Sequence, residues 1–253
     1  MSAALGTPHL HLRATTSTND RARELAVAGA PHGTLVTAGA QSAGRGRQGR
    51  AWTAPPGRAL LMSLVLRVNR PAPLPVFGHG DGRLPPPGPT GSAGLALLPL
   101  AAGVAVADAC GPDARVKWPN DVQLGGRKVA GILTEGRPQE GWAVLGIGLN
   151  VALRADDLPA ELRDRATGLG LTPEDVPRVL ARVLAALDAA LALPPTALLA
   201  RWRERDALLG RRVAWAGGEG AAAGIDDEGR LRVALDAGGE IVLDAGEVHL
   251  APA

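Results

Sequence analysis

The chain has very little lysine and few aromatic residues. Only two of its 27 cationic side chains are lysines, and it contains no tyrosine, one phenylalanine and five tryptophans. Because 46% of the residues are hydrophobic, the chain can bury a sizeable core, and that core must be aliphatic. The formal net charge of +2 is small, so a broad basic surface for nucleic acid is not expected.

Cysteine and long apolar runs are scarce as well. The single cysteine, Cys110, excludes an internal disulfide and suits a reducing compartment. It ends an Ala- and Val-rich run, which favours a buried structural thiol over a nucleophile. The N-terminus lacks the pattern of a signal peptide, and the most apolar stretch, residues 95–109, is too short to span a bilayer. We therefore expect a soluble, cytoplasmic protein that does not associate with membranes.

Periodicity and turn residues predict an α+β chain with two domains. A catalytic domain over residues 1–209 would contain most of the regular structure, and Gly- and Asp-rich turns between five short strand-like runs predict a small barrel over 210–253. Seven prolines within 69–92 predict an exposed loop. The predicted helices are 19–28, 95–110, 177–193 and 195–209. The predicted strands of the larger domain are 34–38, 60–68, 115–117, 128–135 and 142–150, of which the last two form an antiparallel pair.

A Gly- and Arg-rich loop, residues 44–52, is the richest candidate for chemistry. Its three glycines allow backbone N–H groups to approach an anion, and its three arginines offer multidentate donors to phosphate or carboxylate. Trp52 adds an aromatic face on which a purine could stack. The spacing matches neither a P-loop nor a dinucleotide fingerprint. An RNA-binding tract and a solvated basic loop are the alternatives.

Both lysines lie close together in the chain, at Lys117 and Lys128. Residues 117–121 place a cation, an amide and a carboxylate around a predicted turn, for which a plain charged turn is the alternative. Lys128 lies in a predicted strand, where alternation puts Ala130 and Ile132 on its face. A partly desolvated lysine acts strongly on a nearby anion, although a solubilising edge-strand lysine is the alternative.

A glycine-rich strand end, residues 146–151, offers the amide of Asn150. Glycine in a strand indicates close approach by a ligand or by another backbone, and an asparagine amide can pair with the edge of an adenine. A simple strand-end turn is the alternative. The five histidines show no metal-ligand spacing, and no nucleophile elbow of a hydrolase is present.

Taken together and in order, five segments resemble the bacterial biotin–protein ligase family. They are Thr16–Asn19, Ala40–Trp52, Lys117–Asp121, Arg127–Glu135 and Gly146–Val151. The resemblance implies a central mixed sheet flanked by helices, similar to class II aminoacyl-tRNA synthetases, and an SH3-like C-terminal barrel. It also implies that biotin and ATP form biotinyl-5′-AMP, and that biotin then passes to a lysine of a biotin carboxyl carrier protein of a carboxylase.

The resemblance implies a set of site residues. The implied biotin-binding residues are Ser17, Thr18, Asn19, Gln41, Gly44, Arg45, Lys128 and Gly131. The implied ATP-binding residues are Arg45, Arg47, Arg50, Trp52, Lys117, Asn120 and Asn150. The implied catalytic residues are Lys128, Arg47 and Asp121. Lys128 would bridge the biotin carboxylate and the α-phosphate, while Arg47 and Arg50 would order the loop over the adenylate.

Other expectations follow from the same resemblance. Mg²⁺ would accompany ATP, although no residue identifies its ligands. The chain begins at the catalytic domain, so we expect a ligase without the DNA-binding domain of the bifunctional ligase–repressors and without nucleic-acid binding. A homodimer through the central sheet would be in keeping with the family. The alternatives are a lipoate or octanoate protein ligase or transferase of the same fold, an RNA-binding module, and a catalytically inactive homologue.

Overall fold

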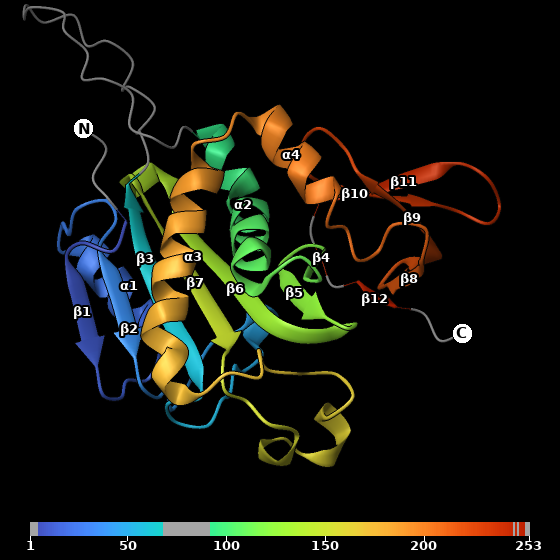
Figure 1. The fold of residues 1–253 in the computed structure, drawn as a ribbon. Helices are drawn as coiled ribbons and strands as arrows, with labels where there is room; N and C mark the ends of the chain where they lie inside the picture. Colours follow the sequence, from blue (N-terminus) through green and yellow to red (C-terminus); the bar gives the residue numbers. More distant parts are fainter. Residues whose placement is uncertain (1–4, 68–91, 245, 247, 251–253) are drawn as a thin grey trace, which may run out of the picture.

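The computed structural model describes residues 5–67, 92–244, 246 and 248–250. Within these residues, seven strands form a central sheet in the order β1-β2-β3-β7-β6-β5-β4 (Figure 1). β1 and β2 pair in parallel, and the other neighbours pair antiparallel, so the sheet is mixed, as predicted. The strands are β1 (His9–Leu12), β2 (Leu35–Ala38), β3 (Ala59–Arg67), β4 (Arg115–Lys117), β5 (Asp121–Leu124), β6 (Arg127–Arg137) and β7 (Trp142–Asn150).

Helices cover both faces of the central sheet (Figure 1). α1 (Thr18–Val27) packs on one face, while α2 (Ser92–Cys110) and α3 (Val176–Leu191) pack on the other. β3 shows why, because its alternating side chains point to opposite faces. Leu60, Met62, Leu64 and Leu66 belong to the large core under α2 and α3, whereas Val65 joins the smaller core under α1. No helix in the described ranges is both long and apolar enough to cross a membrane.

The helix α1, predicted over 19–28, begins and ends at local signals in the sequence. Ser17 is its N-cap and accepts a hydrogen bond from the backbone N–H of Asn19 at 3.3 Å. Such a cap satisfies one of the four free N–H groups at the start of a helix. The helix ends before Gly29, whose φ of 89° is the left-handed conformation that glycine adopts without strain. The cap places Ser17, Thr18 and Asn19 at a fixed point above the sheet.

The C-terminal residues form a second, five-stranded antiparallel sheet, in the order β11-β10-β9-β8-β12. The strands are β8 (Arg212–Trp215), β9 (Gly218–Ile225), β10 (Leu231–Ala234), β11 (Glu240–Leu243) and β12 (His249–Leu250). This sheet is joined to the larger unit, because Trp118 Nε1 donates a hydrogen bond to the Gly229 carbonyl at 3.1 Å. Leu231 and Val233 also belong to the large core. The predicted division after residue 209 stays a prediction.

One helix and two strands differ from the sequence prediction. The helix predicted over 195–209 is shorter, since α4 (Pro195–Arg203) ends at Arg203. Beyond it the chain pairs with β4, where Val116 N–H donates to the Arg205 carbonyl and Ala207 N–H donates to the Val116 carbonyl. The strands β1 and β5 were not predicted. The predicted loop 69–92 falls, apart from Ser92, outside the described residues.

The thiol of Cys110, at the end of α2, is half-buried. Burial raises the pKa of Cys110 to about 12, with Arg182 and Arg205 acting in the opposite direction. A thiol with so high a pKa contains very little thiolate at neutral pH, and the thiolate is the reactive form. The structural role predicted for Cys110 therefore agrees with its surroundings.

Candidate functional site

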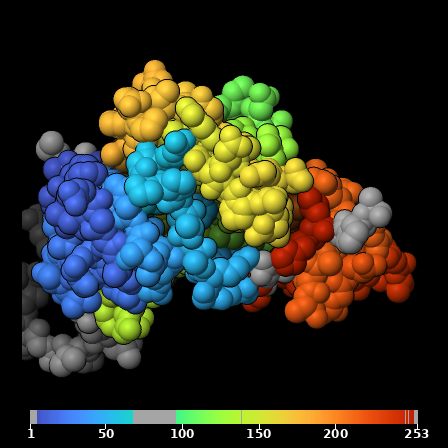
Figure 2. Space-filling view, turned by 90° about the horizontal axis from the view of Figure 1, so that it is seen from below, coloured from blue at the N-terminus to red at the C-terminus, as the bar shows by residue number. Residues whose placement is uncertain are grey.

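A pocket of about 170 Å³ lies on the α1 face of the central sheet, beneath the Gly-Arg loop. Figure 2 shows the molecule from below, with a hollow between the light-blue segment that contains this loop, the yellow segment after β7 and the red C-terminal sheet. Eleven of the fifteen predicted site residues line the pocket. They are Ser17, Thr18, Asn19, Gln41, Arg45, Arg47, Arg50, Trp52, Asn120, Lys128 and Gly131.

Three glycines on neighbouring strands form the floor of the pocket. Gly131 of β6 lies directly opposite Gly148 of β7 in the strand register. A Cβ on Gly148 would lie 2.4 Å from Cε2 of Trp52, and one on Gly146 would lie 2.0 Å from Oδ1 of Asn19. Both separations are far below van der Waals contact. Only glycine therefore lets α1 and the loop approach the sheet this closely.

The α1 end of the pocket is buried and carries no charge. Ser17, Thr18 and Asn19 are each less than 5% exposed. The backbone N–H of Thr18 donates to Gln41 Oε1 at 2.7 Å, and Thr18 Oγ1 lies 3.0 Å from the same oxygen. Below them, Ser63 Oγ lies 2.8 Å from Thr18 Oγ1 and 2.6 Å from Asn19 Oδ1. This end can therefore form hydrogen bonds with the polar groups of a neutral ligand.

Arg45 lies at the rim of the buried end, between two carboxylates. Its guanidinium donates to Asp20 Oδ1 and to Glu135 Oε1, both at 2.7 Å. The hydrogen bond to Asp20, with the nearby charge of Glu135, raises the pKa of Arg45. Glu135 also accepts a hydrogen bond from Asn19 Nδ2 at 2.8 Å. The loop is thus held to both α1 and β6 by one arginine.

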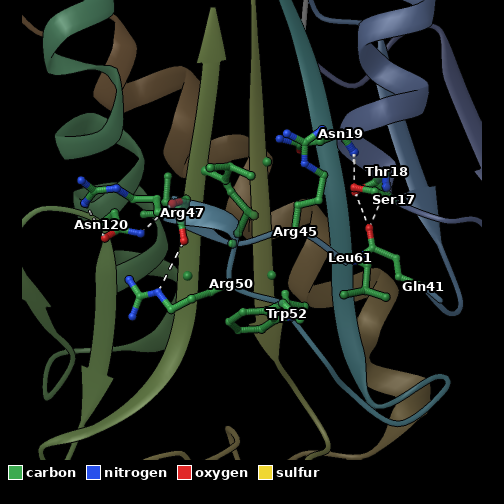
Figure 3. Close-up of a pocket in the computed structure, with 18 of the residues that line it drawn as sticks. Ser17, Thr18, Asn19, Gln41, Arg45, Arg47, Arg50, Trp52, Leu61 and Asn120 are labelled. Carbon is green, nitrogen blue, oxygen red and sulfur yellow. Dashed lines mark hydrogen bonds between the residues drawn. The ribbon is translucent and has the colours of Figure 1, made fainter. Parts of the chain in front are cut away.

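The opposite end of the pocket carries the loop's other arginines. Arg47 donates to Asn120 Oδ1 at 3.0 Å and to the carbonyl of Gly246 at 3.2 Å, so it connects the loop with the segment between β4 and β5 and with the segment between β11 and β12. Asn120 in turn donates to the Ile132 carbonyl at 2.9 Å. Arg50 donates to the Arg47 carbonyl at 3.4 Å. In Figure 3, Ser17, Thr18, Asn19 and Gln41 lie on one side, Arg47 and Asn120 lie on the other, and Arg45 and Trp52 lie between them.

Lys128 reaches the pocket from β6. Its Nζ lies 2.7 Å from Asp121 Oδ1, in an ion pair without aligned hydrogen-bond geometry, and 5.6 Å from the centre of the Trp52 ring. A Cβ on Gly131 would lie 3.2 Å from Lys128 Cε, which places Gly131 on the Lys128 face. Lys128 is thus the amine that faces the space between the loop and the sheet.

The expectation that Ala130 and Ile132 share the Lys128 face is therefore wrong. β5 and β6 shift register between Val122 and Gln123, because Val122 pairs with Ala130 whereas Gln123 pairs with Lys128. Val129 is the extra residue of a β-bulge, and a bulge reverses the alternation beyond it. Val129 and Ala130 are both fully buried in the large core. The bulge is what brings Lys128 and Gly131 to the same pocket.

Four of the predicted site residues do not line the pocket. The side chain of Asn150 is buried and donates to the Thr167 carbonyl at 3.0 Å. Asp121 reaches the site through Lys128, Lys117 ends β4, and Gly44 lies against the carbonyl of Trp52. Their predicted roles stay predictions.

Ser63 and Glu135 were not singled out from the sequence, although both belong to the polar network under the pocket. The sequence contains one indication of the role of Ser63, because this serine is the one polar residue in the run from Ala59 to Leu66. Buried polar groups need partners, so a serine inside an apolar strand indicates a network. No local pattern distinguishes Glu135.

Comparisons with known proteins agree on one family. Residues 12–80 and 101–151 match the model of the biotin/lipoate A/B protein ligase family. Over 161 residues the chain is 40% identical to the bifunctional ligase/repressor BirA of Bacillus spizizenii, covering 61% of this chain and 43% of that protein, so it spans less than half of that relative. Over 257 residues it is 37% identical to the biotin–acetyl-CoA-carboxylase ligase of Mycobacterium tuberculosis, covering 93% of this chain and 86% of that protein.

A solved structure gives the same result for the fold. The biotin protein ligase from Aquifex aeolicus in complex with biotin and ATP matches with a TM-score of 0.75 and 27% identity, covering 98% of this chain and all of that chain. The match extends over both the mixed central sheet and the second antiparallel sheet. The chain belongs to the biotin/lipoate A/B protein ligase family, and within it to the biotin–protein ligases.

Proposed function

We propose that the protein forms biotinyl-5′-AMP from biotin and ATP and transfers biotin to a lysine of the biotin carboxyl carrier domain of a carboxylase. One observation supports this most strongly, namely that a single pocket joins a buried, neutral, hydrogen-bonding end to an end that carries Lys128, Arg47 and Arg50. Biotin is complementary to these two ends, because its neutral ureido ring suits the hydrogen-bonding end and its carboxylate suits the cationic end. The names of the relatives point to the same reaction.

The buried end fits the ureido ring. Ser17, Thr18 and Gln41 offer oxygens and an amide at the depth of the pocket, and Asn19 lies beside them. Buried hydrogen-bonding groups discriminate strongly, because a ligand that cannot pair with them leaves them unsatisfied. Gly44, Arg45 and Gly131 would contribute mainly through close backbone approach. This end would set the choice of substrate.

The cationic end fits the reacting groups. The biotin carboxylate must attack the α-phosphate of ATP, so two anions must meet. Lys128 would lie between them and lower their repulsion, and fixed cations of this kind stabilise charge that develops in the transition state. Asp121 holds the Lys128 ammonium by an ion pair at 2.7 Å before substrates bind. With Lys117 and Asn120, it would then orient the incoming carrier lysine.

The Gly-Arg loop would close over the adenylate. Arg47 already connects the loop to Asn120 and to Gly246, and Arg50 bonds within the loop. Trp52 would stack on the adenine, and its indole N–H is buried without a hydrogen-bond partner among the described residues. Asn150 would read the edge of the base. These contacts would restrain the reactive mixed anhydride until a carrier lysine arrives.

The described residues include no group of three or more His, Cys, Asp or Glu side chains that could hold a metal ion. We therefore assign no ligand to the Mg²⁺ expected with ATP and derive no step through it. The second sheet would close into an SH3-like barrel, and β1 at the free edge of the central sheet would permit a homodimer.

The exchange of labelled pyrophosphate into ATP tests the proposal directly. The reaction would be run with biotin, with lipoate and with neither. Exchange that depends on biotin alone is the expected result, and transfer of labelled biotin to a carrier domain would then complete the reaction. Exchange driven by lipoate would assign the site to a lipoate ligase instead. No exchange with either acid would contradict the proposed activity.

A further inference from the structure

We propose that Ser63 and Glu135, neither of which lines the pocket, fix the direction of the hydrogen bonds at its buried end. They thereby make that end an acceptor that selects a ligand with an N–H group. The inference rests on the proposed function, because it explains how the pocket would recognise the ureido ring. It assigns positioning roles to two residues, and the carboxylate of Glu135 is where the direction is set.

Glu135 fixes the orientation of the Asn19 amide. A carboxylate only accepts hydrogen bonds, so the Asn19 atom 2.8 Å from Glu135 Oε2 must be the nitrogen. The oxygen Oδ1 of Asn19 therefore faces Ser63. Arg45 donates to the other oxygen of Glu135 at 2.7 Å, in an ion pair with this carboxylate. Asn19 thus presents an obligate acceptor to Ser63.

The single hydroxyl proton of Ser63 must then point at Asn19. The two oxygens are 2.6 Å apart, and Asn19 Oδ1 has no proton to give. Ser63 is completely buried, so leaving this contact without a proton would set two lone pairs against each other in a dry environment. With its proton committed, Ser63 Oγ can only accept from Thr18.

Thr18 completes the relay. Its hydroxyl proton has two acceptors within reach, Ser63 Oγ at 2.8 Å and Gln41 Oε1 at 3.0 Å. Gln41 Oε1 already accepts the backbone N–H of Thr18 at 2.7 Å, whereas Ser63 Oγ has no other donor among the described residues and its contact with Thr18 is the shorter one. The proton therefore goes to Ser63. Thr18 Oγ1 and Gln41 Oε1 are left 3.0 Å apart as two acceptors at the pocket wall.

A ligand N–H placed between these two oxygens would relieve their repulsion. The ureido ring of biotin carries two N–H groups, whereas the dithiolane ring of lipoate carries none. A site that demands a donor rejects a ligand without one, because its acceptors then remain buried and unpaired. The relay from Glu135 through Asn19, Ser63 and Thr18 is thus a device for substrate choice.

The test compares biotin with an analogue methylated on both ureido nitrogens, by calorimetry on wild type and on Ser63→Ala. Without Ser63, the Thr18 proton turns to Gln41 and the acceptor pair is lost. We expect the Kd of biotin to rise about tenfold, as one buried hydrogen bond would give. The ratio of the Kd of the methylated analogue to that of biotin should fall by a similar factor. A merely structural loss would weaken both ligands equally and leave the ratio unchanged.

Glu135→Ala provides a second route that leaves the large core intact, because the Glu135 side chain is partly exposed. It frees the Asn19 amide to turn, so the ratio should fall here too. Asp20→Asn is the matched control, since it removes the other carboxylate of Arg45 without touching the relay. Whatever it does to overall affinity, it should leave the ratio at the wild-type value.

The outcomes separate this inference from the proposed function. A wild type that prefers biotin, with a ratio that collapses in both variants and persists in the control, supports the relay. A wild-type ratio retained by Ser63→Ala and Glu135→Ala overturns the relay and leaves the ligase intact. A wild type that does not bind biotin overturns both.

Discussion

Ser17, Thr18 and Asn19 at one end of the pocket are less than 5% exposed, whereas the Lys128 side chain at the other end is 36% exposed. The first group is held by a helix cap, by hydrogen bonds with Ser63 and Gln41, and by the hydrogen bond from Asn19 to the Glu135 carboxylate. The second depends on loop arginines and one strand lysine. The same pocket therefore combines a buried, hydrogen-bonded end with a charged, partly exposed end.

This difference separates two tasks. Neutral hydrogen bonds in a buried place discriminate well, because an unpaired group there costs about 1–3 kcal/mol. Exposed ion pairs contribute only about 0–1 kcal/mol to stability. The same cations can nevertheless stabilise the negative charge that develops on a reacting phosphate. We therefore expect changes at the buried end to alter selectivity and stability, and changes at the cationic end to alter rate.

The largest effect is expected for Lys128→Ala. Removing a cation that stabilises the transition state should reduce pyrophosphate exchange by about 10²–10³-fold. The fold should be little affected, because the lost ion pair with Asp121 is partly exposed. Exchange assays and thermal melting would measure the two quantities. Lys128→Arg is the control, which keeps the charge in a different shape, and full exchange in Lys128→Ala would contradict the role of this lysine.

A matched pair of floor glycines should show the next largest effect. In Gly146→Ala the new Cβ would lie 2.0 Å from Oδ1 of the buried Asn19, so we expect a loss of stability of about 1–3 kcal/mol through overpacking. The affinity for biotin should fall as well. In Gly148→Ala the new atom meets the Trp52 ring, which the exposed loop can move, so ATP use should suffer more than stability. Equal melting temperatures for the two variants would refute the distinction.

Arg47→Gly should loosen the cover of the adenylate. The change removes the bonds to Asn120 and Gly246, and losing a charge-assisted hydrogen bond of about 1.5–3 kcal/mol should speed release of biotinyl-AMP about tenfold. Released adenylate would label bystander lysines, which a streptavidin blot of added albumin detects. Arg50→Ala, which loses a bond within the loop, should release less. Labelling no higher than in wild type would contradict this role of Arg47.

The sequence predicted the parts of the site that have local signals. Capping residues located the start of α1, alternation located the pair of β6 and β7, and composition located the Gly-Arg loop. Features that depend on distant pairing were not predictable. The early end of α4 at Arg203 and the relay through Glu135 arise because segments far apart in the chain meet. The bulge at Val129 lies within the β5–β6 hairpin, and the alternation of residue types around it gave no sign of the register shift.

Ionic strength should give the smallest effect and a direct contrast between the two ends. The Debye length falls from about 10 Å at 0.1 M salt to about 3 Å at 1 M, so attraction of ATP to Arg47, Arg50 and Lys128 should weaken. We expect the KM for ATP to rise severalfold over this range. Biotin amide is uncharged and would contact mainly the buried end, so its Kd should change less than about twofold. If its Kd rose in parallel with the KM for ATP, charge rather than neutral hydrogen bonding would govern both ends, and the separation of selectivity from rate would fail.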